Sequence, residues 1–282
     1  MAFPSGFDGT DLDVFRPEIW SSKINEFFRA NLKAANHFLD LSGELSGGGD
    51  TINIPNVLEI SATQKVNAVA VAPDTTTQTD INLTVDTWYY AAVQIEKREN
   101  AQVKQSYMLQ ERFAKALAYA VAKQLDTAIC TLFQGFSQTA GSSSATLADS
   151  DIREAIRELD VDDVPKDDRA FFFHPNEIWG DLMAIDKYTL LNEAGNSPIN
   201  NGAVAMLYGI PVYSTTQITA TTALGRCGAL AHKEAIVWAS LYGIETDTNY
   251  IPEYLATLIT ADIVYGVLEN RDSAGCLIQS AS

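Results

Sequence analysis

One long helical pattern, between residues 96 and 136, constrains the fold more than any other feature of the sequence. Apolar side chains recur there at spacings near three and four, which is the period of one buried helix face. They are Val103, Phe113, Leu117, Val121, Leu125, Ile129 and Leu132, and Gly135 follows as a C-terminal stop. A continuous helix of about 35 residues would be about 50 Å long, several times the average helix length. Because the apolar stripe is not a sustained heptad, we favour one long helix over a coiled coil.

Residues 47 to 57, GGGDTINIPNV, place three glycines directly before an extended segment. A phosphate-binding loop needs a different order, in which the glycines follow a strand and precede a helix N-terminus. Neither Lys-Ser nor Lys-Thr follows the glycines here. We therefore interpret them as a hinge for the segment that follows.

The extended pattern continues from residue 51 to residue 95. Ile52 and Ile54 alternate with polar residues, and so do Ile81 and Leu83, which is typical of strands. Thr, Asn and Gln are common on both faces, so a two-stranded ribbon of this composition would be marginally stable in isolation. We predict an arm on a glycine hinge that lies on a partner.

A strongly aromatic helical pattern precedes the ribbon, from Pro17, which suits the first turn of a helix. Its apolar residues recur at spacings near three and four: Ile19, Trp20, Ile24, Phe27, Phe28 and Leu32. An apolar face on an N-terminal arm must be covered, either by the same chain or by a neighbour.

The second half of the chain has the alternation of an α/β domain. The segment ADSDIREAIRELD predicts an amphipathic helix with Asp149 or Ser150 as its N-cap. RAFFFHP predicts a strand covered on both faces, and NEIWGDLMAIDKY predicts a helix capped by Asn176. AVAMLYGIPVYSTTQI predicts extended chain with a glycine-proline interruption. CGALAHKEAIVWA predicts a strand that leads into a short helix or more extended chain, and the C-terminal segment is rich in strands.

Composition places this chain among soluble globular proteins. The formal net charge of −17 disfavours binding to nucleic acid through counterion release. The three cysteines, Cys130, Cys227 and Cys276, are far apart, which favours reduced thiols over a disulfide framework or a cysteine-rich metal site. The N-terminal segment does not have the pattern of a signal peptide, and no apolar run reaches the roughly 18 residues that a membrane span needs.

No motif for chemistry emerges from the sequence. HExxH, GxSxG, SxxK, GxGxxG and the P-loop are all absent. The histidines, His37, His174 and His232, share no local neighbourhood, and His174 is expected to be a satisfied strand-end residue. The acidic run LDVDDVPKDD lacks the glycine and terminal glutamate of an EF-hand. We therefore predict no catalytic residue, no cofactor and no metal site.

The order of segments resembles the major capsid (coat) proteins of tailed bacteriophages, which have the HK97-type fold. FRPEIWSSKINEFFRANL is similar to the start of many phage coat proteins. GDTINIPNV followed by VDTWYYAAVQIEKRENAQ resembles the extended loop and its return into the spine helix. FFFHPNEIWGDLMAIDKY and LYGIPVYST resemble segments of the axial domain. The resemblance covers nearly the whole chain.

The resemblance implies an α+β fold with five segments in order. They are an N-terminal arm (1–43), an extended hairpin loop with its return strand (44–95), the spine helix of the peripheral domain (96–136), an α/β axial domain (137–250) and C-terminal strands that return to the peripheral domain (251–282).

The resemblance also implies a structural protein and not an enzyme. Copies of the chain would form hexamers and pentamers of an icosahedral shell around double-stranded phage DNA, which is held without sequence specificity. The implied location is the virion capsid, assembled in the cytoplasm of the host bacterium, with no membrane contact. A portal protein and a decoration protein are further implied partners. Because the arm starts almost at Met1, without a long N-terminal assembly domain, we also expect a separate scaffolding protein, or else a chain that has already been processed.

Contacts between copies are expected from the arm and from the ribbon. We assign them to Trp20, Phe27, Phe28, Ile52, Ile54, Ile81 and Leu83. Some members of the family cross-link a lysine to an asparagine; Lys65 and Asn270 occupy suitable segments, but an ordinary solvated lysine is the favoured interpretation.

Three alternatives remain open at this point. They are an encapsulin, which is a shell of the same fold around a cargo enzyme; an enzyme with an unrecognised carboxylate site; and a tail or decoration protein, against which the long helix argues.

Overall fold

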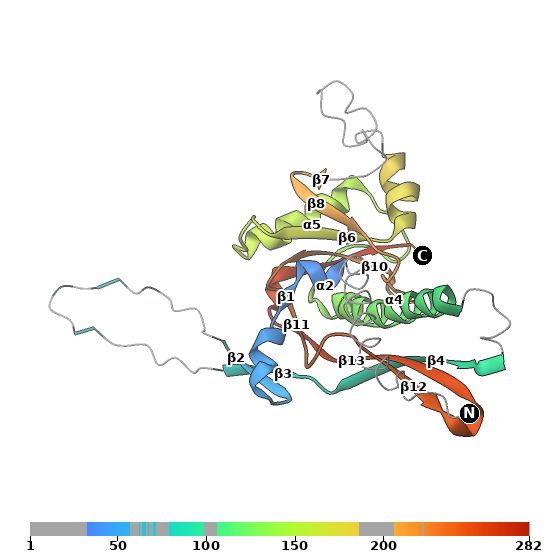
Figure 1. The fold of residues 1–282 in the computed structure, drawn as a ribbon. Helices are drawn as coiled ribbons and strands as arrows, with labels where there is room; N and C mark the ends of the chain where they lie inside the picture. Colours follow the sequence, from blue (N-terminus) through green and yellow to red (C-terminus); the bar gives the residue numbers. More distant parts are fainter. Residues whose placement is uncertain are drawn as a thin grey trace, which may run out of the picture.

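The computed structural model describes residues 33–56, 79–98, 106–185, 206–221 and 223–281, together with residues 62, 64, 65, 67, 70 and 71. Two sheets and two main helices stack in four layers, with a two-stranded ribbon projecting from one side (Figure 1). The layer order is helix α5, a seven-stranded sheet, helix α4 and a five-stranded sheet.

The long helix forms the centre of the molecule. α4 (Ser106–Leu132) ends in a turn of 3-10 helix, η2 (Phe133–Gly135). Leu117, Val121, Leu125 and Ile129 are all at most 5% exposed, so the predicted apolar face is confirmed as core. A strand extends to Glu96, residues 97 and 98 are helical, and the described part of α4 begins at Ser106, so the prediction of one helix from residue 96 lies partly outside the described residues.

The five-stranded sheet covers one side of α4. β13 (Ala256–Glu269) is its longest strand and pairs antiparallel with three others. Those three are β4 (Thr87–Glu96), β11 (Ile236–Ser240) and β12 (Glu245–Ile251), and β1 (Leu39–Asp40) pairs parallel with β11. The inward residues of β13, among them Ile259, Ile263 and Tyr265, pack in the same core as α4.

The seven-stranded sheet covers the other side of α4. Its strand order is β5-β14-β10-β6-β8-β7, with β9 also paired to β10. The strands are β5 (Gln138–Gly141), β6 (Arg169–Phe173), β7 (Met206–Leu207), β8 (Ile210–Ser214), β9 (Ala220–Thr221), β10 (Gly225–His232) and β14 (Gly275–Ser280).

The three consecutive phenylalanines of strand β6 are buried on both faces of the sheet. Phe172 faces the core around α4, whereas Phe171 and Phe173 face α5 (Asp149–Val161) on the other side of the sheet. All three rings are fully buried. The prediction of a strand covered on both faces is confirmed.

Three local predictions in this half of the chain need correction. The N-cap of α5 is Ala148, because the Asp151 carboxylate reaches back and accepts the Ala148 N–H at 2.9 Å. The segment predicted as a helix from Asn176 is a turn of π-helix, η3 (Glu177–Asp181), followed by a 3-10 turn, η4 (Leu182–Ala184). The side chain of Asn176 makes no capping bond.

The buried side chain of Glu177 anchors η3 to its surroundings. Its carboxylate accepts the His174 N–H at 2.7 Å and the Ser280 hydroxyl at 2.6 Å. Burial raises the pKa of this carboxyl group. The side chain therefore ties η3 to the last strand of the sheet.

The segment CGALAHKEAIVWA forms β10 and β11, which a turn at residues 233–235 joins, with no helix between them. The remaining short elements are α2 (Ala34–His37), η1 (Ser42–Gly47), η6 (Pro252–Tyr254) and η7 (Asp272–Ala274). No helix in the described residues is long and apolar enough to cross a membrane. Cys130, Cys227 and Cys276 are all buried and unpaired.

Candidate assembly interface

The ribbon begins as two paired strands, β2 (Thr51–Asn56) and β3 (Thr79–Thr84). Ile52 lies opposite Leu83 and Ile54 lies opposite Ile81, so the four side chains share one face. Gly48 and Gly49 precede β2 with φ angles of +87° and +131°, which are backbone conformations that residues other than glycine rarely adopt. The two predicted strands of the ribbon are confirmed, and the role of the glycines as a hinge stays a prediction.

The base of the ribbon packs on its own subunit. Ile52 and Leu83 are 7% and 1% exposed, and they form a cluster with Val237 and Ala239 of β11. These two side chains are therefore core residues that fix the ribbon to the five-stranded sheet, and the assignment of both to contacts between copies needs correction. Ile54 and Ile81 are only partly buried.

A glycine lets the ribbon base approach the sheet closely. A Cβ atom on Gly266 of β13 would overlap the carbonyl oxygen of Thr84 and lie 3.1 Å from the Val85 Cα. The chain after β3 therefore packs directly against the backbone of β13 at Gly266. This contact defines the point at which the ribbon leaves the body.

Next to the ribbon base, the outer face of the five-stranded sheet carries exposed aromatic rings. Trp88 and Tyr90 of β4 pair with Val264 and Asp262 of β13, on the face turned away from α4. We call these four residues the aromatic strip. Trp88 is 69% exposed and Tyr90 is 74% exposed.

Asp262 holds the strip in place. Its Oδ2 accepts the Trp88 indole N–H at 2.9 Å and the Tyr242 hydroxyl at 2.8 Å. Burial and this carboxylate raise the pKa of Tyr242 to about 12. Since the Trp88 N–H is already bonded, what this side chain offers to a partner is mainly apolar ring surface.

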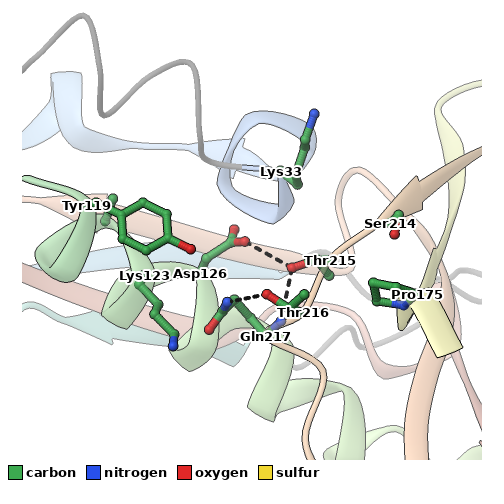
Figure 2. Close-up of a pocket in the computed structure, with 10 residues that line it drawn as sticks. Lys33, Tyr119, Lys123, Asp126, Pro175, Ser214, Thr215, Thr216 and Gln217 are labelled. Atoms are coloured by element: carbon green, nitrogen blue, oxygen red, sulfur yellow. Dashed lines mark hydrogen bonds between the residues drawn. The ribbon is translucent and has the colours of Figure 1, made fainter. Parts of the chain in front are cut away.

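The N-terminal arm is attached to the body through Asp126 of α4. Its Oδ1 accepts the Ala34 N–H at 2.9 Å and the Ala35 N–H at 3.4 Å, at the start of α2. Its Oδ2 accepts the Thr215 hydroxyl at 3.4 Å (Figure 2). Burial raises the pKa of Asp126, and these hydrogen bonds partly offset that effect. One carboxylate thus connects the arm, the long helix and the end of β8.

The polar pocket around Asp126 has a volume of about 230 Å³. Lys33, Tyr119, Lys123, Thr216 and Gln217 line it around the Asp126 carboxylate (Figure 2). The Gln217 amide donates to the Thr216 hydroxyl at 2.8 Å. The pocket lies where the arm enters the body.

Trp20, Phe27 and Phe28 lie outside the described residues, so the structure gives no account of them. Sequence reasoning missed the aromatic strip and the role of Asp126. TWYY was recognised only as strand, although its alternation already puts Trp88 and Tyr90 on one face. No local signal links Asp126 to Ala34, because the two are 92 residues apart.

The histidines that sequence analysis considered for chemistry make local contacts, which are hydrogen bonds for two of them and ring packing for His37. His174 Nδ1 accepts the Asn176 N–H and His232 Nδ1 accepts the Glu234 N–H, both at 3.2 Å. The ring of His37 packs against Phe38 and Phe172, and burial lowers its pKa. In the part of the chain that is described, no three His, Cys, Asp or Glu side chains gather where they could hold a metal ion.

Residues 78–276 match the family of phage capsid proteins, which is well over half of the chain. The chain belongs to the phage capsid protein family. No curated protein matches the sequence of this capsid protein. It is accordingly a structural protein of the viral shell and not an enzyme, and the family favours a phage shell over the cargo-enclosing alternative.

Solved structures show the same fold over almost all of this capsid protein. One of Mycobacterium phage Che8 has a TM-score of 0.75 at 18% identity, over 89% of this chain and 93% of that one. The mature capsid of bacteriophage PhiM1 has a TM-score of 0.69 at 14% identity, over 88% and 87%. The capsid of cyanophage Pam1 has a TM-score of 0.62 at 12% identity, over 87% and 89%. The HK97-type α+β fold is therefore shown, and the protein is located in the virion capsid.

Proposed function

We propose that this capsid protein assembles through two surfaces, the aromatic strip and the outer part of the ribbon, into hexamers and pentamers of an icosahedral shell. The observation that carries the proposal is the pair of exposed rings, Trp88 and Tyr90, on a sheet face that the ribbon base covers only in part. Monomeric proteins rarely leave clustered large aromatic side chains uncovered. The proposed occupant is a second copy of the chain, because copies of one subunit form the shell.

The ribbon is the other proposed surface. Ile54 and Ile81 are less buried than Ile52 and Leu83, which lie nearer the body. The apolar face therefore becomes more exposed with distance from the sheet. We assign contacts between copies to Ile54 and Ile81, and we retain Trp20, Phe27 and Phe28 of the arm as proposed contacts.

The domain division is proposed from the sheets. The five-stranded sheet with α4 corresponds to the peripheral domain, and the seven-stranded sheet with α5 corresponds to the axial domain. This grouping differs from the sequence boundaries of 137–250 and 251–282 in two places. β11 and β12 belong to the five-stranded sheet, and the C-terminal strand β14 belongs to the seven-stranded sheet.

The remaining partners are proposed on family membership and charge. They are double-stranded DNA inside the shell, a portal protein, a decoration protein and a separate scaffolding protein, with assembly in the host cytoplasm. A net charge of −17 disfavours tight binding to DNA phosphates, which supports the proposal that the shell encloses DNA without adhering to it. Uniform closed shells formed by the chain alone would contradict the need for a scaffold.

Sedimentation velocity of the full chain, co-expressed with a candidate scaffolding protein, tests the aromatic strip. Replacing Trp88 and Tyr90 together by Ala should remove the capsomer and shell peaks and leave folded subunits, because the lost contact is mainly apolar. The matched control replaces both by Phe, which keeps the rings, and it should assemble. Thermal unfolding checks that the Ala variant is folded. Normal shells from a folded Ala variant would show that the strip is not an interface.

A further inference from the structure

The charged side chains of the five-stranded sheet are all acidic. Its strands β1, β4, β11, β12 and β13 contain no lysine and no arginine. Two carboxylates of β12, Glu245 and Asp247, lie on the same face as the aromatic strip, because Thr246 between them is buried on the inner face. The exposed rings of the strip therefore lie on a face of one sign of charge.

Two like charges lie directly opposite each other on this face. Glu245 of β12 pairs with Asp262 of β13 across two antiparallel strands. Opposed like charges destabilise a sheet. Within the described residues, neither carboxylate forms a salt bridge with a lysine, an arginine or a histidine. The described part of the subunit thus leaves the negative charge of this pair without a compensating cation.

The two exposed rings lie next to this pair of carboxylates. Tyr90 pairs with Asp262 on the side away from Glu245, so the three side chains form one row across three strands. Trp88 lies in the next row, and its indole N–H donates to Asp262 at 2.9 Å. The faces of indole and phenol rings attract cations through their quadrupole. A cation bound to these carboxylates would therefore also contact ring surface.

We propose that the aromatic strip and Glu245 together recognise a lysine or arginine side chain of a second copy, which pairs with the two carboxylates and packs on the two rings. This inference rests on the proposed function, in which the strip is a contact between copies, and it adds the chemistry of the occupant.

Charge complementarity selects this occupant. An interface that covered the pair with apolar or acidic groups would bury two carboxylates without a partner, which is costly. An ammonium or guanidinium group removes that cost. Arginine suits the site especially well, because its planar group stacks on aromatic rings and forms paired hydrogen bonds with carboxylates.

The same charges determine how two copies can meet. Two strips cannot face each other, because the sheet that carries them supplies no cation to either side. The strip of one copy must therefore contact a different surface of the next copy. Contacts between unlike surfaces continue from copy to copy and close into rings when the rotation allows.

Charge reversal separates this local recognition from the general repulsion between acidic copies. Glu245→Lys and Asp167→Lys each replace one negative charge by one positive charge, so each changes the net charge from −17 to −15. Asp167 is exposed in the loop after α5 and is the matched control. Light scattering of the full chain, with a fixed amount of a candidate scaffolding protein, gives the subunit concentration needed for shells. Asp167→Lys should lower this threshold slightly, whereas Glu245→Lys should raise it several-fold.

Glu245→Gln separates recognition from folding. It removes the repulsion between opposed carboxylates, so the Tm of the free subunit should be unchanged or higher. The assembly threshold should nevertheless rise. Asp262→Asn keeps an acceptor oxygen for the Trp88 N–H and should raise the threshold by a different change. These two variants decide the question even if Glu245→Lys folds poorly.

The outcomes distinguish this inference from the proposed function. Normal assembly of the variant with Ala at both Trp88 and Tyr90 would overturn both, because the strip would not be an interface. If that variant fails to assemble but Glu245→Gln and Asp262→Asn keep the wild-type threshold, the strip is an interface without a cationic occupant, and this inference alone is overturned. Shells of Asp262→Asn freed of scaffolding protein should dissociate at lower urea than wild-type shells. Equal resistance would assign the cation to the scaffolding protein and would overturn the second copy as occupant.

Discussion

At the scale of single residues, Asp126 joins three segments that are far apart in the sequence. It is 4% exposed, and it accepts hydrogen bonds from two backbone N–H groups and one hydroxyl that belong to distant segments. Buried donors that lose their acceptor are costly, so the side chain controls the site at which the arm joins the body.

Replacing Asp126 by Ala should lower the free energy of unfolding by about 1–3 kcal/mol, the typical cost of unsatisfied buried donors. Asn, which keeps an acceptor oxygen and the same shape, is the matched control and should cost less. Because burial raises the pKa of Asp126, the stability that it contributes is lost as pH rises through the folded value. The free energy of unfolding of the Asn variant should therefore rise relative to that of the wild type as pH increases. Urea unfolding at about pH 4 and about pH 7 measures this; a constant difference would contradict it.

Asp126 also shows a limit of sequence reasoning at this scale. Leu117, Val121, Leu125 and Ile129 were predicted as core because each repeats a period that is visible along the chain. The partners of Asp126 come from α2 and from Thr215, the residue after β8, and nothing in its own helix indicates them. The cap of α5 was misassigned for a smaller reason, since an Asp three residues into the helix can satisfy the same backbone N–H.

At the scale of elements, the ribbon depends on the packing of its base. β2 and β3 form only one pair of strands, which is marginal alone, and the cluster of Ile52 and Leu83 with Val237 supplies the missing support. The sequence predicted both strands and their shared face. It did not show that the inner half of that face is covered by the same chain, because β11 is more than 150 residues away.

Gly266→Ala should weaken the packing of the ribbon base on the five-stranded sheet. The added methyl group overlaps the Thr84 carbonyl, so β3 must move or the sheet must deform, at a cost of about 1–3 kcal/mol. Thermal unfolding should show a lower Tm, and hydrogen exchange in residues 79–85 should increase more than in α4. Gly43→Ala, where nothing lies within 4 Å, is the control and should have little effect. An unchanged Tm in Gly266→Ala would mean that β3 does not need this close approach.

At the scale of the whole molecule, the layer order was predictable only in outline. The change from helical to α/β patterns and the family resemblance together predicted a peripheral and an axial domain, but strand order was not visible. β10 and β11 follow each other closely and yet lie in different sheets, whereas β14 pairs parallel with β5, more than 130 residues earlier. Such pairings depend on contacts that a local pattern does not contain.

The net charge of −17 predicts a salt effect on assembly. Copies of one acidic chain repel each other at low ionic strength, and screening weakens that repulsion at distances beyond about 10 Å at 0.1 M salt. The subunit concentration needed for shells should therefore fall as sodium chloride increases from about 0.02 M to about 0.2 M. Light scattering at a series of subunit concentrations measures the threshold. A threshold that rises with salt would indicate that attractive ion pairs dominate the contacts.

The three buried thiols have a practical consequence. Burial raises the pKa of each, so the folded subunit offers little thiolate to a maleimide. A cysteine introduced at an exposed position, such as residue 253, would be the single thiol on each copy that reacts readily with a maleimide. Labelling such handles before and after assembly would distinguish the outside of a particle from its inside without any further mutation of the native chain.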